Sequence, residues 1–204
     1  MITLEALAAF PRLLEAHYAD IPAALKNWAP PSWEGIPSER FTAIEQVCHV
    51  RDIEIEGYQV RFRRTLDELN PMLPGIDSES LAVSRAYASS AAASALADFA
   101  KARAATLALV SGLEARQLDR AAIFEGYGRT SLRGLIHYLC SHDQQHLAGL
   151  QWLLGKMQAA QATPREHHYL TAGTDFCSSS GRSSNLPPGR QTSTSLRTPK
   201  RPAR

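Results

Sequence analysis

Apolar residues recur at spacings of three and four along most of the chain, which is the period of helices with one buried face. Four stretches keep this period long enough for long helices, and a fifth stretch is short. The long ones cover about residues 3–26, 39–69, 89–118 and 130–158, and the short one about 79–87. The sequence therefore predicts an all-α fold in which four long helices form an up-and-down-type four-helix bundle.

The segments between these stretches are rich in proline and glycine, which interrupt helices. Residues 27–39, 70–77 and 119–129 are accordingly predicted to be connecting loops. Thr42 followed by Glu45 has the spacing of a capping box, which favours a helix start at this point. Pro11 and Pro22 fall inside the first stretch, so it forms either one kinked helix or two shorter pieces.

Two histidines on the last stretch are the strongest candidates for chemistry. His142 and His146 continue the apolar stripe that Leu135 and Leu139 begin. Side chains four residues apart on a helix lie on one face, so two imidazoles can reach the same metal ion. His49, near the start of the second stretch, is the natural third ligand. The alternative is that these histidines are hydrogen-bonded core residues, as isolated buried histidines usually are.

Charge is distributed unevenly along the chain. The formal net charge is +2, yet acidic residues outnumber basic ones in residues 1–162. Residues 161–204 are basic and rich in Ser, Thr and Pro without an apolar period, so we expect a disordered tail behind a bundle formed by residues 1–160. Nucleic-acid binding by this tail is not expected. Three widely spaced cysteines and the absence of a signal-peptide or anchor pattern predict a cytoplasmic protein without membrane contact.

Three motifs together resemble the DinB-like superfamily. They are the H-x-x-D-x-E of His49 to Glu54, the S-H-x-x-x-H-L that contains His142 and His146, and the W-x-P…W loop before the second helix. The resemblance covers about residues 3–160. It implies a DinB-like four-helix bundle in which His49, His142 and His146 bind one divalent metal ion, and it implies a homodimer, because many members are dimers.

The resemblance implies less about the reaction. We expect a metal-dependent transferase that uses a low-molecular-weight thiol, or a hydrolase, acting on a small-molecule substrate. Three neutral imidazoles leave one position of a tetrahedral ion open for water or a thiolate, so zinc is the first candidate, with nickel, iron or manganese as alternatives. Two further hypotheses remain: a metal-binding stress-response protein without turnover, and a helical interaction module whose histidines only pack in the core.

The surroundings of the metal are harder to predict. Asp52 is expected to hold a ligating histidine or to border the substrate cavity, together with Trp28 or Trp33. Gln145 and Arg51 could also border it, although for Arg51 a solvent-facing position is preferred. No carboxylate base is evident beside the site, which favours a thiol over water as the nucleophile, and no catalytic residue is named. Cys48 and Cys140 are predicted to be buried small hydrophobes rather than ligands.

Overall fold

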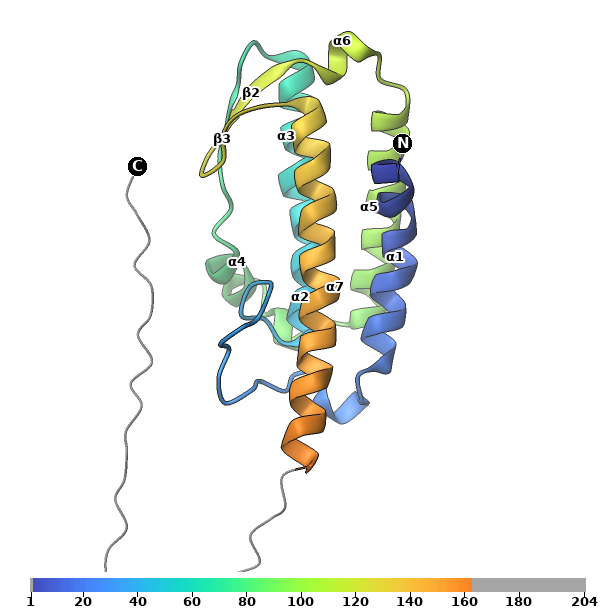
Figure 1. Ribbon diagram of the computed structural model, residues 1–204, viewed down its shortest axis with the longest axis vertical. Coiled ribbons are helices and arrows are strands. Elements are labelled where there is room, and N and C mark those ends of the chain that lie inside the picture. Colours follow the sequence, from blue (N-terminus) through green and yellow to red (C-terminus); the bar gives the residue numbers. More distant parts are fainter. Residues whose placement is uncertain (1, 163–204) are drawn as a thin grey trace, which may run out of the picture. The chain divides into compact units, whose positions relative to one another are not determined.

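The computed structural model describes residues 2–162, and the predicted tail lies outside the described residues from residue 163 onward. Four long helical segments confirm the predicted four-helix bundle (Figure 1). They are α1 (Ile2–Asp20), a second segment built of α2 (Ala43–Asp52), η2 (Ile53–Tyr58) and α3 (Gln59–Asp67), α5 (Ala92–Ser111) and α7 (Leu132–Ala162). Shorter helices lie between them: η1 (Ala23–Leu25), α4 (Ser78–Ser84), η3 (Tyr87–Ser89) and α6 (Ala115–Leu118).

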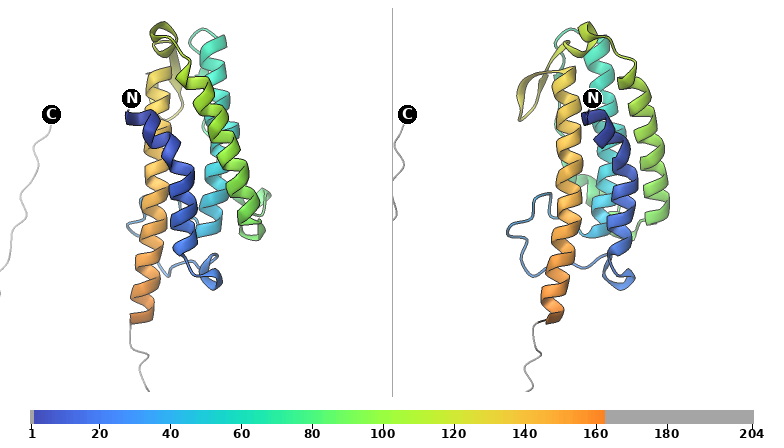
Figure 2. Two further views of the ribbon diagram at one scale, coloured as in Figure 1. Left: turned by 90° about the vertical axis from the view of Figure 1, so that its right-hand side faces the viewer. Right: turned by 45° about the vertical axis from the view of Figure 1, so that its right-hand side comes forward.

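The four segments run in two directions. Helices α1 and α7 descend in Figure 1, whereas α2 with α3 and α5 ascend, and the rotated views in Figure 2 agree. Helix α1 packs against α5 and α7, and α2 packs against α5. Because α2–α3 and α5 are parallel, the chain must cross back between them, and residues 68–91 make this connection.

The start of the bundle follows the expected pattern only in part. Helix α1 continues through Pro11 but ends at Asp20, and the residues after Pro22 form the separate 3-10 turn η1. The capping box at the start of α2 is present, with the backbone N–H of Thr42 donating to Glu45 Oε2 at 2.8 Å. Helix α2 therefore begins where the sequence signal places it.

The second long helix is not a continuous α-helix, because η2 is a π-helical turn. A π turn accommodates one residue more than an α turn and shifts the faces of all later residues. An unbroken α-helical period would place Ile55 and Leu69 on one apolar face with Cys48 and Phe62, since these residues are seven apart. Ile55 is 37% exposed, and Leu69, beyond the end of α3, is 88% exposed.

A small sheet replaces one of the predicted loops. Residues 119–129 were expected to be a plain link, but they contain β2 (Ala121–Phe124) and lead into β3 (Gly128–Ser131). These strands pair antiparallel, with Phe124 opposite Gly128, and β1 (Met72–Leu73) adds a parallel third strand beside β2. Gly126 and Gly128 both have φ of 80°, a conformation that glycine adopts without strain, and this closes the hairpin.

Two apolar clusters fill the bundle and leave a polar layer between them. One contains Val47 and Val50 of α2 together with Leu147 and Leu150 of α7. The other contains Ile53, Tyr58 and Phe62 on the second segment, and Leu135 and Leu139 on α7. Along α7 the two clusters are therefore separated by the turns that carry His142 and His146. Among the described helices, none is both long and apolar enough to cross a membrane.

Candidate metal centre

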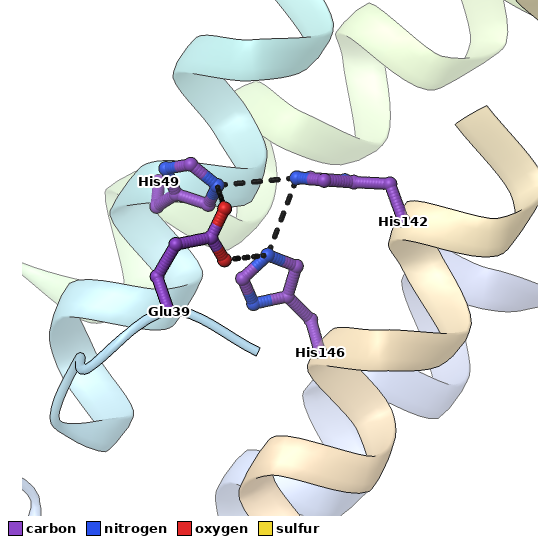
Figure 3. A group of neighbouring side chains, drawn as sticks. All are labelled: Glu39, His49, His142 and His146. Carbon is purple, nitrogen blue, oxygen red and sulfur yellow. Dashed lines mark hydrogen bonds and ion pairs between the residues drawn. The ribbon is translucent and has the colours of Figure 1, made fainter. Parts of the chain in front are cut away.

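The three histidines singled out in the sequence come together between α2 and α7 (Figure 3). The Nε2 atom of His142 lies 3.1 Å from that of His49 and 3.2 Å from that of His146. His49 and His146 are buried, with 1% and 0% of the residue exposed. Because the bundle packs α2 against α7, the i, i+4 pair and the third histidine reach one point in space.

Glu39 adds a fourth donor that the sequence did not reveal. It lies in the loop before α2, and its carboxylate oxygens are 3.5 Å from His49 Nε2 and 3.2 Å from His146 Nε2. One ligand atom from each of the four residues falls within a group no wider than 4.8 Å. Burial raises the pKa of Glu39, but the contacts with His146 and His49 outweigh it and lower the pKa to about 2. The carboxylate is therefore ionised at neutral pH.

The orientation of His146 is fixed by Gln46. The Gln46 Nε2 amide donates to the carbonyl of Phe41 at 3.3 Å, so its Oε1 faces His146 Nδ1 at 3.1 Å and accepts a hydrogen bond. A neutral His146 then carries its proton on Nδ1 and presents the Nε2 lone pair to the cluster. This nitrogen faces the Glu39 carboxylate, whose Oε2 atom is buried without a hydrogen-bond partner.

The donor set fits a divalent cation. Burial, followed by the proximity of His146, lowers the pKa of His49 to about 3. Burial also lowers the pKa of His142 well below its ordinary value, and the nearby His146 and His49 add to the effect. The lone pairs of neutral imidazole nitrogens and of a carboxylate oxygen repel one another when they point at the same place. A divalent metal ion bound there accepts these lone pairs and removes the repulsion.

Close packing behind the cluster depends on Gly149. A Cβ atom at this position would lie 2.7 Å from Gln46 Oε1 and would also collide with Ser38 Oγ. Only glycine lets α7 approach both the residue that orients His146 and the loop that carries Glu39.

A buried ion-pair network lies on the other side of α7. Arg103 of α5 pairs with Glu54 Oε2 at 2.9 Å and with Asp143 Oδ2 at 2.6 Å, and each of the three side chains is at most 1% exposed. Asp143 is the neighbour of His142 in sequence, and burial raises its pKa to about 7 in spite of Arg103. The Glu54 position of the H-x-x-D-x-E motif therefore serves this network rather than the histidine cluster.

Asp52, the other acidic position of that motif, does not hold a ligating histidine. Its carboxylate accepts a hydrogen bond from the Tyr87 hydroxyl at 2.6 Å and pairs with Arg51 at 2.7 Å and with Arg85 at 2.8 Å. The prediction that Asp52 holds a histidine or borders the cavity at the site was wrong. Asp52 lies three residues after His49 on the helix, and its carboxylate faces Arg85 at the end of α4 and Tyr87 of η3.

The other predicted neighbours also lie elsewhere. Trp33 stacks on Trp152 with ring centroids 6.2 Å apart. Trp28, like these two rings, packs against the apolar cluster that contains Val47 and Leu150. Gln145 is exposed, and none of these residues lines the cavity beside the histidines. The two cysteines in the described part of the chain, Cys48 and Cys140, are not among the converging donors.

The cavity that reaches His49 and His142 has a volume of about 170 Å³. It is walled by the second helical segment, by residues 75–78 and by the β2–β3 hairpin. Its polar lining residues other than the histidines include Glu39, Tyr58, Arg61 and Glu125. The hairpin that the sequence did not predict thus supplies one wall of the cavity.

Comparisons with known proteins agree with this architecture. The family model of the DinB superfamily matches residues 6–150. Among solved structures, the chain is similar to YfiT from Bacillus subtilis, with a TM-score of 0.67 and 18% sequence identity over 76% of this chain and 86% of that one. YfiT is described as a probable metal-dependent hydrolase with an unusual four-helix bundle topology. No curated protein matches the sequence.

Proposed function

The chain belongs to the DinB superfamily, and from this premise we propose that it is a metal-dependent hydrolase of a small-molecule substrate. The observation that carries the proposal is the convergence of His49, His142, His146 and Glu39 on one point, beside a cavity that the first two histidines and Glu39 line. A divalent ion held there would lower the pKa of a bound water molecule or thiol toward 7 and so supply a nucleophile at neutral pH. The description of YfiT supports the same class of reaction.

Glu39 is the candidate general base. Its side chain is 37% exposed, whereas those of His49 and His146 are at most 1% exposed. It is also the only one of the four donors that comes from a loop rather than a helix, so it can move without disturbing the packed core. An ionised carboxylate in this place can orient an attacking water molecule and accept its proton.

A thiol is the second candidate nucleophile. The sequence favoured it because no carboxylate base was evident, and Glu39 removes that reason. The transferase hypothesis therefore stays a proposal of its own, in which a low-molecular-weight thiol takes the place of water. Zinc remains the first candidate for the metal, with nickel, iron or manganese as alternatives, and a cytoplasmic homodimer remains the proposed state.

Metal analysis with matched variants tests the first half of the proposal. We expect the purified full-length protein to hold one divalent ion per chain by elemental analysis. His146→Ala should lose most of this metal and keep its helical circular dichroism, because apolar packing supplies most of the folding energy. His137→Ala is the control, since this exposed histidine lies on the same helix outside the cluster. Failure of the unaltered protein to take up a divalent ion would refute the site.

Turnover is tested separately with the metal-loaded protein. A panel of esters and amides is compared with a panel of thiols and electrophiles, using the unaltered protein, His142→Ala and Glu39→Gln. We expect hydrolysis that Glu39→Gln slows by about 10²–10⁴-fold, the usual contribution of a general base, while more of the metal remains than in His142→Ala. Thiol transfer without hydrolysis would select the transferase. Equal rates for all three proteins in both panels would leave the non-catalytic metal-binding hypothesis.

A further inference from the structure

Arg61 is a buried cation for which the described part of the chain supplies no counter-ion. The residue is only 5% exposed and lies in the wall of the cavity that leads to the histidines. Its Nη2 donates to the carbonyl of Pro74 at 3.1 Å, while its Nε is buried and has no hydrogen-bond partner. Among the described residues no carboxylate forms an ion pair with it. A buried charge in this state is costly unless another group neutralises it.

Four arginines near the cavity and on neighbouring helices show what Arg61 lacks, whereas the arginines that also have no acidic partner, such as Arg63 and Arg120, are not buried. Arg103, which is buried to a similar degree, is held by two carboxylates. Arg51, Arg64 and Arg85 are more exposed, and each still pairs with an acidic side chain. Within residues 2–162, the buried Arg103 is neutralised by two carboxylates, whereas the buried Arg61 in the cavity wall has no carboxylate partner. This is typical of a residue that receives an anionic ligand.

The surroundings hold the Arg61 guanidinium in place. It lies 4.5 Å from the ring centroid of Phe124 and 5.2 Å from that of Tyr58. A Cβ atom on Gly57 would come within 2.8 Å of Nη1, so the guanidinium also rests against the backbone at this glycine. These contacts restrict its motion, which reduces the entropy lost when it binds a ligand.

The same aromatic ring connects Arg61 with the histidines. The Tyr58 ring centroid lies 6.1 Å from that of His142. Arg61 and His142 both line the cavity, on either side of Tyr58 in this chain of contacts. A ligand held by the guanidinium therefore extends along Tyr58 toward the proposed metal position.

Charge and volume restrict what the ligand is. Glu39 and Glu125 also line the cavity, so a dianion such as a phosphate monoester would meet two carboxylates and only one guanidinium. A monoanionic carboxylate matches the single positive charge and the planar fork of arginine. The cavity volume of about 170 Å³ is close to that of a cavity of about 150 Å³ that holds benzene.

We propose that the substrate is a small carboxylic acid whose carboxylate binds Arg61 while its reactive group lies at the histidine cluster. This inference rests on the proposed function for its second half only, because the contact with Arg61 does not need a metal. Arg61 is accordingly a residue that determines substrate specificity.

Calorimetric binding of benzoate and of benzamide, its neutral analogue of the same size, tests the inference with the full-length protein. Both are titrated into metal-free and metal-loaded protein, together with the smaller acids acetate and butyrate. We expect an acid to bind metal-free protein and its amide to bind at least about tenfold more weakly, the effect of losing a hydrogen bond to a charged group. Arg61→Gln should abolish the preference, and Arg61→Lys should retain part of it.

Arg63→Gln is the matched control, because Arg63 is exposed on the same helix two residues away. It should bind the acids as the unaltered protein does. Equal binding of acid and amide, or no binding of any acid at millimolar concentration, overturns the inference. Binding of an acid that requires the metal and is unchanged in Arg61→Gln also overturns the inference. If Arg61→Gln does not fold, the acid and amide comparison in the unaltered protein and in Arg61→Lys decides. Absence of metal uptake refutes the proposed function and leaves this binding test intact.

Discussion

In mild acid, His49 should make a destabilising contribution to the metal-free protein. Burial and the neighbouring His146 lower the pKa of His49 to about 3, whereas an unfolded chain has a histidine pKa near 6.5. Between these values the unfolded state binds a proton that the folded state does not. The contribution of neutral His49 to the free energy of unfolding is therefore fully present above about pH 6.5, and it is lost progressively as the pH falls toward 3.

The magnitude follows from the two pKa values. Lowering the pH from about 7.5 to about 5.5 protonates His49 in the unfolded chain and costs about 1.4 kcal/mol of unfolding free energy. His142 adds a loss of the same sign, because burial lowers its pKa as well. Glu39 contributes nothing in this range, since its pKa of about 2 and the ordinary value for glutamate both lie below it. Asp143 acts in the opposite direction: burial raises its pKa to about 7, so it takes up a proton in the folded protein over the same range and stabilises the fold by about 2 kcal/mol.

Urea unfolding of the chelator-treated protein at the two pH values, followed by circular dichroism, measures this difference. His49→Gln should reduce the pH dependence by about the amount that His49 contributes. His17→Gln, a change of a histidine on α1 outside the cluster, should leave the dependence in place. The same pH dependence in His49→Gln as in the unaltered protein would contradict the assignment of a buried, neutral His49.

Three further predictions concern the packing around the site. Gly149→Ala should cost about 1–3 kcal/mol of unfolding free energy and weaken metal binding, because the added methyl group displaces Gln46; unchanged metal affinity in a titration would refute this. Arg103→Met should cost about 3–5 kcal/mol in urea unfolding, since it leaves two carboxylates buried without a cation, and a smaller loss would show that they are solvated. Free metal at about 100 times its Kd should add about 2.7 kcal/mol, which a chelator removes; an unfolding free energy that does not change with metal would argue against a site in the folded state.

Sequence periodicity predicts the regular helices, because in such a helix residues one turn apart lie on the same face and share the same environment. The four long helices and the convergence of His142 and His146 on one face follow from this local rule. His49 was placed by its position near the start of a capped helix and by the family resemblance. These features need only helix geometry and the packing of two apolar faces.

The missed parts depend on contacts between segments that are distant in sequence. Glu39 sits in a loop without a period, and nothing local distinguishes it from a solvent-facing glutamate until Gly149 of α7 lets that loop approach. Phe124 and Tyr127 reach the cavity through a hairpin whose signal was the pair of glycines at 126 and 128. Asp52 was misassigned because proximity in sequence to His49 was taken as proximity in space. Three residues of α-helix fall about 60° short of a full turn, and the Asp52 carboxylate faces Arg85 instead.

The π turn η2 explains how one helix serves both the histidine cluster and the Arg61 end of the cavity. His49, Ile53, Tyr58 and Arg61 all line the cavity at successive spacings of four, five and three. In an uninterrupted α-helix, Tyr58 would point about 140° away from Ile53, because five residues exceed one turn. The extra residue in η2 absorbs this difference and returns Tyr58 to the cavity face, while Ile55 is left in solvent.

We expect the second helix to tolerate the loss of Ile55. Without it the segment can continue as a regular α-helix, with Tyr58 and all later residues on their present faces, so the unfolding free energy should change by no more than about 1 kcal/mol. Deletion of Val60, which is exposed to a similar extent at 41%, is the matched control. Either Phe62 or Tyr58 must then rotate out of the core, at a cost of at least about 3 kcal/mol. Equal losses for the two deletions in urea unfolding would show that η2 does not set the register of this helix.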